Sequence, residues 1–320
     1  MTGFLVGDSR PRRPRIRAWL QQGLLAGFLC AIAAGPAASA ESLRWKLKAG
    51  ESLRYTMVQE ISQQMKLPDR DLKQTTNLTV NLHWSVKSVA SDGVAEMTQT
   101  IDRVRLKVDA PDTSFEFDSQ NPKGPEGPIA TQLTPLLKAL VGVEFNVRMN
   151  PRGQFIEVKV PQKLVESLRQ AGPPGAAGGM LSEEGIKNLI SQVSLTFPEE
   201  DLEKGKSWSS RSRFPIPKVG TLVMDRTFTY QGSDPKAADL RQVSLKSSVK
   251  LEPTGDSNEA VKITSHDGKG EFTFDPQAGR ILSTRVNDLL RMTLSVQGQD
   301  LEQTTETVTT MTLARDGQPK

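Results

Sequence analysis

Apolar and polar residues alternate at every second position along much of the chain after residue 40. Between residues 75 and 89 the apolar positions are Leu78, Val80, Leu82, Trp84 and Val86. A period of two is the pattern of a β-strand with one buried face, because successive side chains of a strand point to opposite faces. The stretch 95–108 continues the alternation after a turn at 91–93, with a slip near Asp102 that predicts a β-bulge.

The second half of the chain repeats this pattern. The stretch 241–253 alternates in the same way, and the stretch 259–265 follows it after a turn predicted at 254–258. Gly153 and Gly279 are each expected to close a hairpin turn. An Asn-Pro or Asp-Pro pair precedes each of them, and glycine adopts a positive φ without strain.

One short phrase occurs twice. "LKAGESLRYTM" at 47–57 and "LEKGKSWSSRS" at 202–212 share Leu, Gly, a charged residue, Ser and a large apolar residue at the same spacing. Together with the alternating strands and the two hairpins, which follow in the same order, the phrase predicts an internal duplication. The predicted repeats are residues 41–198 and 199–314, followed by a disordered tail at 315–320.

Amphipathic helices are predicted between the two alternating regions, near residues 134–141, 162–171 and 183–194. Each stretch carries apolar residues at helical spacing on one face. Pro135 is expected at the first position of the first helix, and Ser182 is a candidate N-cap for the third. The Gly-, Pro- and Ala-rich run at 171–179 is expected to form a flexible loop.

Residues 1–40 have the order of a secretory signal peptide: an Arg-rich start, an apolar middle at 20–34, and small residues before Ala40. The apolar middle is shorter than the roughly 20 residues of a membrane-spanning helix. The pair Arg12–Arg13 resembles a twin-arginine leader, but a proline and an arginine follow it, which favours general export. Cleavage after Ala40 is expected, which would leave a periplasmic or extracellular protein with no transmembrane span.

The leader also decides the charge and cysteine content. The whole chain has 41 Lys and Arg against 37 Asp and Glu, and removing five arginines and one aspartate with the leader leaves 36 of each. Nucleic-acid binding is therefore not expected, because it depends on surplus basic charge. The only cysteine, Cys30, lies in the leader, so no disulfide is expected. Lipid anchoring at Cys30 is the less favoured alternative, since no small residue precedes it.

Candidate chemistry is sparse. The sequence contains no GxSxG, Walker or HExxH motif. His83 lies on the polar side of an alternating strand and is interpreted as solvated, and His266 beside Asp267 is interpreted as part of a turn. A cluster of acids lacks the spacing of a calcium loop and is interpreted as a solvated loop and strand edge; its members are Asp109, Asp112, Glu116 and Asp118. We expect no enzyme activity, metal or cofactor.

The apolar faces of the helices allow two interpretations. They complete a core against the sheet, which is the more frequent arrangement, or they line a cavity for an acyl chain or a similar ligand. The candidate lining residues are Leu136, Leu137, Leu140, Ile186, Leu189 and Ile190. Aromatic residues such as Trp45, Trp84 and Trp208 fit either interpretation.

Several stretches carry a resemblance to a known family: "LKAGESLRY", "TIDRVRLKVDAP", "LVGVEFNVRMNPRGQFIEV", "GKSW" and "FDPQAGRI". They are similar to a family of exported bacterial proteins of unknown function. More loosely, the succession of long strands with few helices resembles the half-open barrels of periplasmic lipoprotein carriers and lipid-binding lipoproteins. This resemblance implies a hydrophobic ligand and supplies no catalytic residue.

These patterns predict a mainly β protein (α+β minor) with long twisted antiparallel strands, a half-open barrel, an internal pseudo-duplication and two or three inserted helices. The leading hypothesis for function is non-catalytic binding of an apolar ligand such as a lipid, or of a partner protein, in the cell envelope. The alternatives are a structural or assembly protein without a small ligand and, third, a hydrolase with no recognised motif. A cavity beneath the helices would favour the first, and flat exposed strand edges the second.

Overall fold

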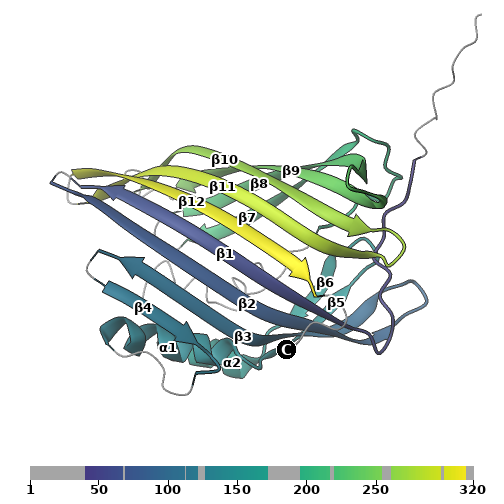
Figure 1. The fold of residues 1–320 in the computed structure, drawn as a ribbon, viewed down its shortest axis with the longest axis horizontal. Coiled ribbons are helices and arrows are strands. Elements are labelled where there is room, and N and C mark those ends of the chain that lie inside the picture. The colour runs from purple at the N-terminus through teal and green to yellow at the C-terminus, as the bar shows by residue number, and fades with distance from the viewer. Residues whose placement is uncertain are drawn as a thin grey trace, which may run out of the picture. The chain divides into compact units, whose positions relative to one another are not determined.

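One antiparallel sheet makes up most of the chain in the computed structural model (Figure 1). The described residues are 40–67, 69–111, 113–121, 127–171, 195–216, 220–253, 261–296 and 299–314. Their strands are β1 (Ser52–Lys66), β2 (Asp71–Val89), β3 (Ala95–Ala110), β4 (Thr113–Asp118), β5 (Glu144–Met149), β6 (Phe155–Lys159), β7 (Ser207–Ile216), β8 (Gly220–Asp234), β9 (Ala237–Pro253), β10 (Val261–Asp275), β11 (Arg280–Val296) and β12 (Gln299–Leu313). Their helices are α1 (Pro128–Leu140) and α2 (Gln162–Ala171). The prediction of a mainly β chain with long antiparallel strands is confirmed.

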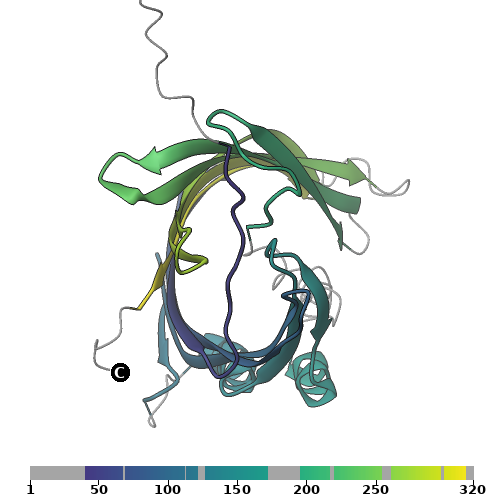
Figure 2. The ribbon, with the colours of Figure 1, turned by 90° about the vertical axis from the view of Figure 1, so that its right-hand side faces the viewer.

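The strand order brings the first and last strands of the chain together. From edge to edge the order is β6-β5-β3-β2-β1-β12-β11-β10-β9-β8-β7, and β4 pairs with β3 beside this path. The edges of the sheet are β6 and β7, so the sheet is open. It curls strongly, and Figure 2 shows the strands as an arc that surrounds an interior. The expectation of a half-open barrel is therefore confirmed, and all strands belong to a single sheet.

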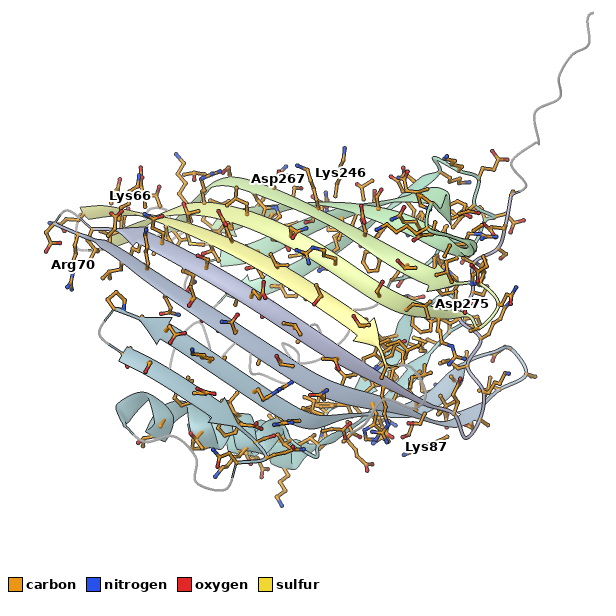
Figure 3. The ribbon with its side chains drawn as sticks, viewed as in Figure 1. Lys66, Arg70, Lys87, Lys246, Asp267 and Asp275 are labelled. Carbon is orange, nitrogen blue, oxygen red and sulfur yellow. The ribbon has the colours of Figure 1, made fainter. Side chains whose placement is uncertain are left out.

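We call the face that carries Tyr55 and Trp84 the inner face. The register assigns alternate residues of each strand to it, since Tyr55 pairs with Leu82 and Leu53 pairs with Trp84. The outer face carries exposed charged side chains, among them Lys246 and Asp267 in Figure 3.

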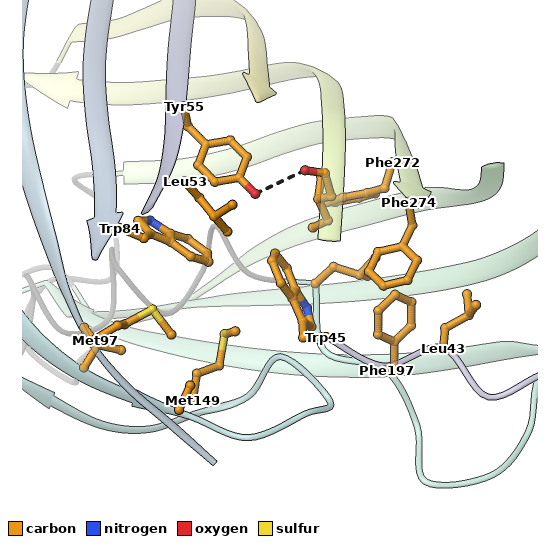
Figure 4. Close-up of a cluster of buried hydrophobic side chains, with 14 of the residues drawn as sticks. Leu43, Trp45, Leu53, Tyr55, Trp84, Met97, Met149, Phe197, Phe272 and Phe274 are labelled. Carbon is orange, nitrogen blue, oxygen red and sulfur yellow. Dashed lines mark hydrogen bonds between the residues drawn. The ribbon is translucent and has the colours of Figure 1, made fainter. Parts of the chain in front are cut away.

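One end of the inner face is filled by a packed aromatic core (Figure 4). Trp45, Tyr55, Trp84 and Phe274 lie in ring contact, with centroid distances of 5.3 to 6.2 Å. The hydroxyl of Tyr55 donates a hydrogen bond to the carbonyl of Ile281 at 3.1 Å, which satisfies its buried polar atom. Large buried rings contribute strongly to stability, so this end is the structural core.

Residues 40–50 cross the same end of the curled sheet (Figure 2). The backbone N–H of Trp45 donates to the carbonyl of Pro151 at 2.7 Å, and the N–H of Lys46 donates to the carbonyl of Gly279 at 3.0 Å. The segment therefore links the β5–β6 turn to the β10–β11 turn, which lie far apart in the sequence.

Both predicted hairpin turns are confirmed. Gly153 lies between β5 and β6 with φ +87°, and Gly279 lies between β10 and β11 with φ +63°. The side-chain oxygens of Asn150 and Asp275 accept hydrogen bonds from backbone N–H groups two to four residues later. Asn or Asp before proline forms the turn in this way in both hairpins.

The repeated phrase also forms the same local structure twice. Gly50, with φ +80°, donates to the carbonyl of Val86, and Gly205, with φ +91°, donates to the carbonyl of Tyr230. In both cases the next N–H bonds to the carbonyl three residues earlier. The phrase is therefore a turn that leads into a strand, β1 in one case and β7 in the other.

The two halves of the chain share these turns, but their strands do not correspond one to one. β1 pairs with the alternating strand β2, whereas β7 pairs with β8, and the alternating stretch 241–253 is the following strand β9. In the second half β10 both follows the alternating strand and begins the hairpin, while the first half uses β3 and β5 for these roles. Local phrases encode turns and alternation, and neither specifies which strands become neighbours.

α1 is longer than predicted. It begins at Pro128 rather than at residue 134, and Pro135 lies inside it instead of at its first position. An internal proline costs about 3 kcal/mol, and the packing of α1 offsets this cost. Leu133 and Leu137 pack against the cluster of Val104 and neighbouring residues on the inner face of β3 and β4. α2 has the predicted bounds, and the predicted helix 183–194 lies outside the described residues.

Candidate ligand site

A cavity of about 410 Å³ lies on the inner face beside the edge strand β7. This volume is within the range of pockets that hold small organic ligands. Its apolar lining consists of Phe197, Pro198, Trp208, Phe214 and Phe228. Its polar lining consists of Arg152, Thr196, Glu199, Glu200, Ser209, Ser210, Ser212 and Arg226.

The hairpin β7–β8 forms the aromatic floor of this cavity. Trp208 and Phe228 are register partners, and their rings stack with centroids 5.6 Å apart. The indole N–H of Trp208 donates to the carbonyl of Thr196 at 2.8 Å. This bond holds residues 195–200 against the hairpin, and the fully buried Phe197 anchors them in the core. The cavity thus lies between a sheet edge and a fastened segment, and it is partly open to solvent.

A row of polar and small residues crosses the inner face next to the cavity. Along the register from β7 to β12 its members are Ser210, Arg226, Ser247, Gly268, Asp288 and Thr307. We call it the polar row. The adjacent row toward the packed end contains Trp208, Phe228 and Leu245, which are apolar. Charged groups on such a face require partners or a ligand, because removing a charge from water is costly.

Gly268 allows two side chains to meet across its strand. Ser247 on β9 and Asp288 on β11 both neighbour Gly268, and the Ser247 hydroxyl donates to Oδ1 of Asp288 at 3.2 Å. A Cβ atom at residue 268 would overlap with both side chains. Glycine is therefore required here for space, since a larger residue would separate the two polar groups.

His266 extends this polar group, and the prediction that it forms a turn pair with Asp267 is wrong. His266 lies within β10, and its Nε2 is 3.3 Å from Oδ1 of Asp288. Its side chain is 5% exposed, and its Nδ1 is buried without a hydrogen-bond partner among the described residues. Because adjacent strand residues point to opposite faces, Asp267 lies on the outer face.

Arg226 joins the polar row to the cavity, since it belongs to both. Burial lowers the pKa of Arg226, and the negative charge of Asp288 opposes this shift. Three strand spacings separate the two backbones, about 14 Å. The residues between them on the inner face are Ser247 and Gly268.

Arg226 and Asp288 were not predicted as site residues, although the sequence contains a signal for both. Each interrupts an alternating apolar series on its strand. The series are Leu222, Met224, Phe228 and Tyr230 for Arg226, and Val286, Leu290 and Met292 for Asp288. A charge at an otherwise apolar inner position indicates a functional or paired group.

The described candidate lining residues pack elsewhere. Leu136 is 9% exposed within the main core, Leu140 packs against that core, and Leu137 packs against the smaller cluster at β3 and β4. None of these three residues lines the cavity beside β7. Ile186, Leu189 and Ile190 lie outside the described residues.

His83 lies on the outer face and has a carboxylate partner. Its Nδ1 is 2.7 Å from Oδ1 of Asp102, and Arg54 is 3.8 Å from the other carboxylate oxygen. The alternation did not reveal this pair because Asp102 sits at the predicted β-bulge, which the register between β2 and β3 confirms. None of the three residues lines the cavity.

The acidic cluster belongs to the hairpin of β3 and β4. Nε of Arg103 donates to Oδ1 of Asp118 at 2.9 Å, and Nζ of Lys107 lies 3.4 Å from Oδ2 of Asp109. The hydrogen bonds from Arg103 lower the pKa of Asp118 to about 2. Asp112 lies outside the described residues, within which no group of three metal-binding side chains occurs.

We expect the Asp118–Arg103 pair to stabilise the protein above pH 4 and to lose its effect toward pH 2. The pKa of Asp118 falls from the ordinary 3.8 to about 2 on folding, so the stabilisation is lost as the pH falls through this window. Urea unfolding of wild type and Asp118→Asn should show a stability difference at pH 6 that shrinks between pH 4 and pH 2. A difference that stays constant over this range would contradict the role of the pair.

A family model matches residues 92–281, which is more than half of the chain. The family, DUF6263, is described as a family of unknown function. The chain belongs to this family. The matched region runs from the turn before β3 to the start of β11, and so contains the cavity lining and Arg226. Among the described residues, neither helix has the length and apolar character needed to cross a membrane.

Solved structures with a similar fold include lipovitellin, in a study of its lipid–protein interactions. The TM-score is 0.50 at 9% identity, and the match covers 86% of this chain and 26% of lipovitellin. This chain therefore spans about a quarter of the lipovitellin chain. An outer membrane channel from Pseudomonas putida F1 matches with TM-score 0.24 at 7% identity, over 84% of this chain and 97% of the channel. The β domain of the Bordetella autotransporter BrkA matches with TM-score 0.23 at 9% identity, over 82% and 98%.

Proposed function

We propose that this protein is an exported, non-catalytic binding protein that holds an apolar ligand such as a lipid on its inner face. The observation that carries the proposal is a set of apolar inner-face side chains between the polar row and the β1–β2 turn. They are partly exposed and belong to neither packed cluster of the described residues: Met65, Leu72, Leu222, Met224, Ile263, Leu290, Met292, Leu294 and Leu301. We call them the open half of the inner face.

The apolar side chains of the open half are less buried than those of the packed end. At the packed end, side chains such as Phe274 and Ile281 are at most 1% exposed. In the open half, the same alternation places apolar side chains on the inner face without enclosing them. Apolar surface that stays accessible is costly in water and is typical of a binding surface.

The comparisons and the leader support the same proposal. The shared fold with lipovitellin links this type of curled sheet with a protein studied for its lipid contacts, and the signal-like residues 1–40 favour an envelope location.

We expect Leu290→Asp to weaken binding of a fluorescent fatty acid about tenfold or more, because burial of a leucine side chain contributes about 1.5–3 kcal/mol. Leu290 lies on the inner face, as the register partner of Thr305, and its neighbour Leu289 lies on the outer face. Leu289→Asp is therefore the matched control, with the same change one position away. The measurement is a probe titration of delipidated wild type and both variants.

Saturable probe binding to wild type with a selective loss in Leu290→Asp supports the proposal. Absence of probe binding to wild type, or equal loss in both variants, counts against it. Native mass spectrometry of protein purified from its own host adds an independent observation, since a bound lipid appears as a defined added mass.

A structural or assembly role is the alternative, and one observation bears on it. Ile156 on the edge strand β6 is 51% exposed, which offers an apolar contact for a partner protein. The same strand has only five residues and carries Glu157 and Lys159, and short charged edges resist strand addition. The ligand-binding proposal is therefore favoured.

A further inference from the structure

We propose that the ligand carries an acidic head group, a carboxylate or a phosphate, which Arg226 binds together with the hydroxyls of Ser210 and Ser212. This inference rests on the proposed function and specifies the chemistry of the ligand at the cavity beside β7. It goes beyond apolar binding, because it predicts discrimination between ligands that have the same chain and different head groups.

Arg226, Ser210 and Ser212 lie close together on two paired strands. Arg226 on β8 and Ser210 on β7 are register partners, and Ser212 is the next inner-face residue of β7. All three line the same cavity. Cross-strand partners on one face lie about 5 Å apart, so one anion can contact both strands. A guanidinium matches a carboxylate or a phosphate with two parallel hydrogen bonds, and hydroxyls add further donors.

The charge of Arg226 lies beside aromatic rings. Arg226 is partly buried, and this burial lowers the pKa of its guanidinium. The floor beside it is formed by the rings of Trp208 and Phe228. In such surroundings an ionic hydrogen bond is stronger than in water. A second anion near Arg226 would therefore stabilise its charged form.

The neighbouring Asp288 has contacts of its own on β9 and β10. Its Oδ1 accepts a hydrogen bond from Ser247 and lies 3.3 Å from Nε2 of His266. These contacts hold the carboxylate at β11, about three strand spacings from the backbone of Arg226. In strand order, Asp288 lies on one side of Arg226, and Ser210, which lines the cavity, lies on the other side.

The acids at the cavity are placed at its rim. The side chain of Glu199 is 80% exposed and forms an ion pair with Arg152 at 2.7 Å, and Glu200 is exposed as well. Solvent and salt screen exposed charges, so these acids weaken anion binding at Arg226 little.

The direction of the apolar chain follows from the alternation of β8. Met224 and Leu222 are the next inner-face residues after Arg226 and belong to the open half. Phe214, the register partner of Leu222, lines the cavity beside them. A head group at Arg226 therefore directs the chain along these residues, away from the packed end.

The test compares dodecanoate with dodecanol, which differ in the head group, by calorimetric titration of the delipidated full-length mature protein. We expect Arg226→Met to weaken dodecanoate binding about tenfold to a hundredfold, the range for losing a hydrogen-bonded ionic contact. Dodecanol binding should change less than about threefold, because its contacts are apolar.

Arg213→Met is the matched control. Arg213 belongs to the same hairpin, lies on the outer face and pairs with Glu252. The substitution removes one positive charge from the same two strands. The variant should therefore bind both ligands as strongly as wild type does. A similar loss in both variants would indicate a general charge effect and would overturn the inference.

The remaining outcomes separate the two proposals. If neither ligand binds wild type, the proposed function fails. If both bind and Arg226→Met affects them equally, the head-group inference fails while apolar binding stands. If inorganic phosphate alone binds wild type tightly and Arg226→Met abolishes this, the site serves a free anion, and the lipid head group is excluded.

If Arg226→Met folds poorly, a second variant tests the same inference. The double variant Arg226→Met, Asp288→Asn removes both opposite charges from the polar row and keeps the contacts of residue 288 with Ser247 and His266. It should retain dodecanol binding and show the same loss for dodecanoate. Dodecanoate binding at wild-type strength in a folded double variant would overturn the inference.

Discussion

Replacing Trp45 by alanine should lower the free energy of unfolding by about 3–5 kcal/mol, the usual range for removing a buried tryptophan or phenylalanine. Trp45 is 4% exposed, and its ring lies 5.6 Å from Trp84 and 6.2 Å from Phe274. The substitution leaves a cavity between strands from both ends of the chain. It also weakens the attachment of residues 40–50, although the backbone hydrogen bond to Pro151 can still form.

Urea unfolding of the chain from Glu41 onward, without the predicted leader, measures this effect. Lys48→Ala is the control, because Lys48 is exposed on the same segment, and surface substitutions usually change stability by less than about 0.5 kcal/mol. A loss below about 1 kcal/mol for Trp45→Ala would show that the segment 40–50 contributes little to the stability of the sheet.

Gly153→Ala should be the second strongly destabilising change, with a loss of about 2–5 kcal/mol. The positive φ of +87° costs a non-glycine residue about 1–2 kcal/mol. The added methyl group would also overlap with the carbonyl oxygen of Leu195 and with the indole of Trp45, and overpacking costs about 1–3 kcal/mol. The substitution therefore strains the backbone and also overpacks the core, because the turn lies directly against the packed end.

Gly205→Ala separates these two contributions. Gly205 has a similar φ of +91°, and a Cβ atom there would meet no atom within 4 Å. Its substitution should therefore cost only the backbone contribution, about 1–2 kcal/mol. Equal losses for the two variants would mean that the close approach of Leu195 and Trp45 to Gly153 is relieved without cost.

Much of the sheet could be predicted from local patterns. The alternation of Leu78, Val80, Leu82, Trp84 and Val86 identifies β2 and its inner face, because strand side chains have a period of two. Gly153 and Gly279 mark two hairpins, because an Asx-Pro turn followed by glycine has its own geometry. Interactions within a few residues decide these features, so one sequence is sufficient to find them.

The limits of the helices and the roles of the histidines could not be predicted in this way. Pro135 is expected to begin a helix, yet α1 starts at Pro128, since packing on β3 and β4 outweighs local preference. His266 was assigned to a turn with its sequence neighbour. Its partner is instead Asp288, on the adjacent strand.

The candidate site depends still more on tertiary structure. The predicted lining residues Leu136, Leu137 and Leu140 pack against the core clusters, and the cavity lies beside β7 instead. Arg226 and Ser210 come together only through the register of β7 and β8. A shift of two residues would keep both side chains on the inner face but separate Arg226 from Ser210, and the alternation alone allows such a shift.

The sequence by itself determined the strand character of much of the chain, the inner and outer positions of clearly alternating strands such as β2, and several of the turns between strands. These follow from side-chain alternation and from backbone preferences at glycine and proline, which act over a few residues. Only the tertiary structure decided that β1 lies against β12, that residues 40–50 close one end of the sheet, and that Arg226, Ser247 and Asp288 form one row. These features arise from pairing between distant strands, where the burial of a shared apolar face selects one register among many that local preferences allow equally.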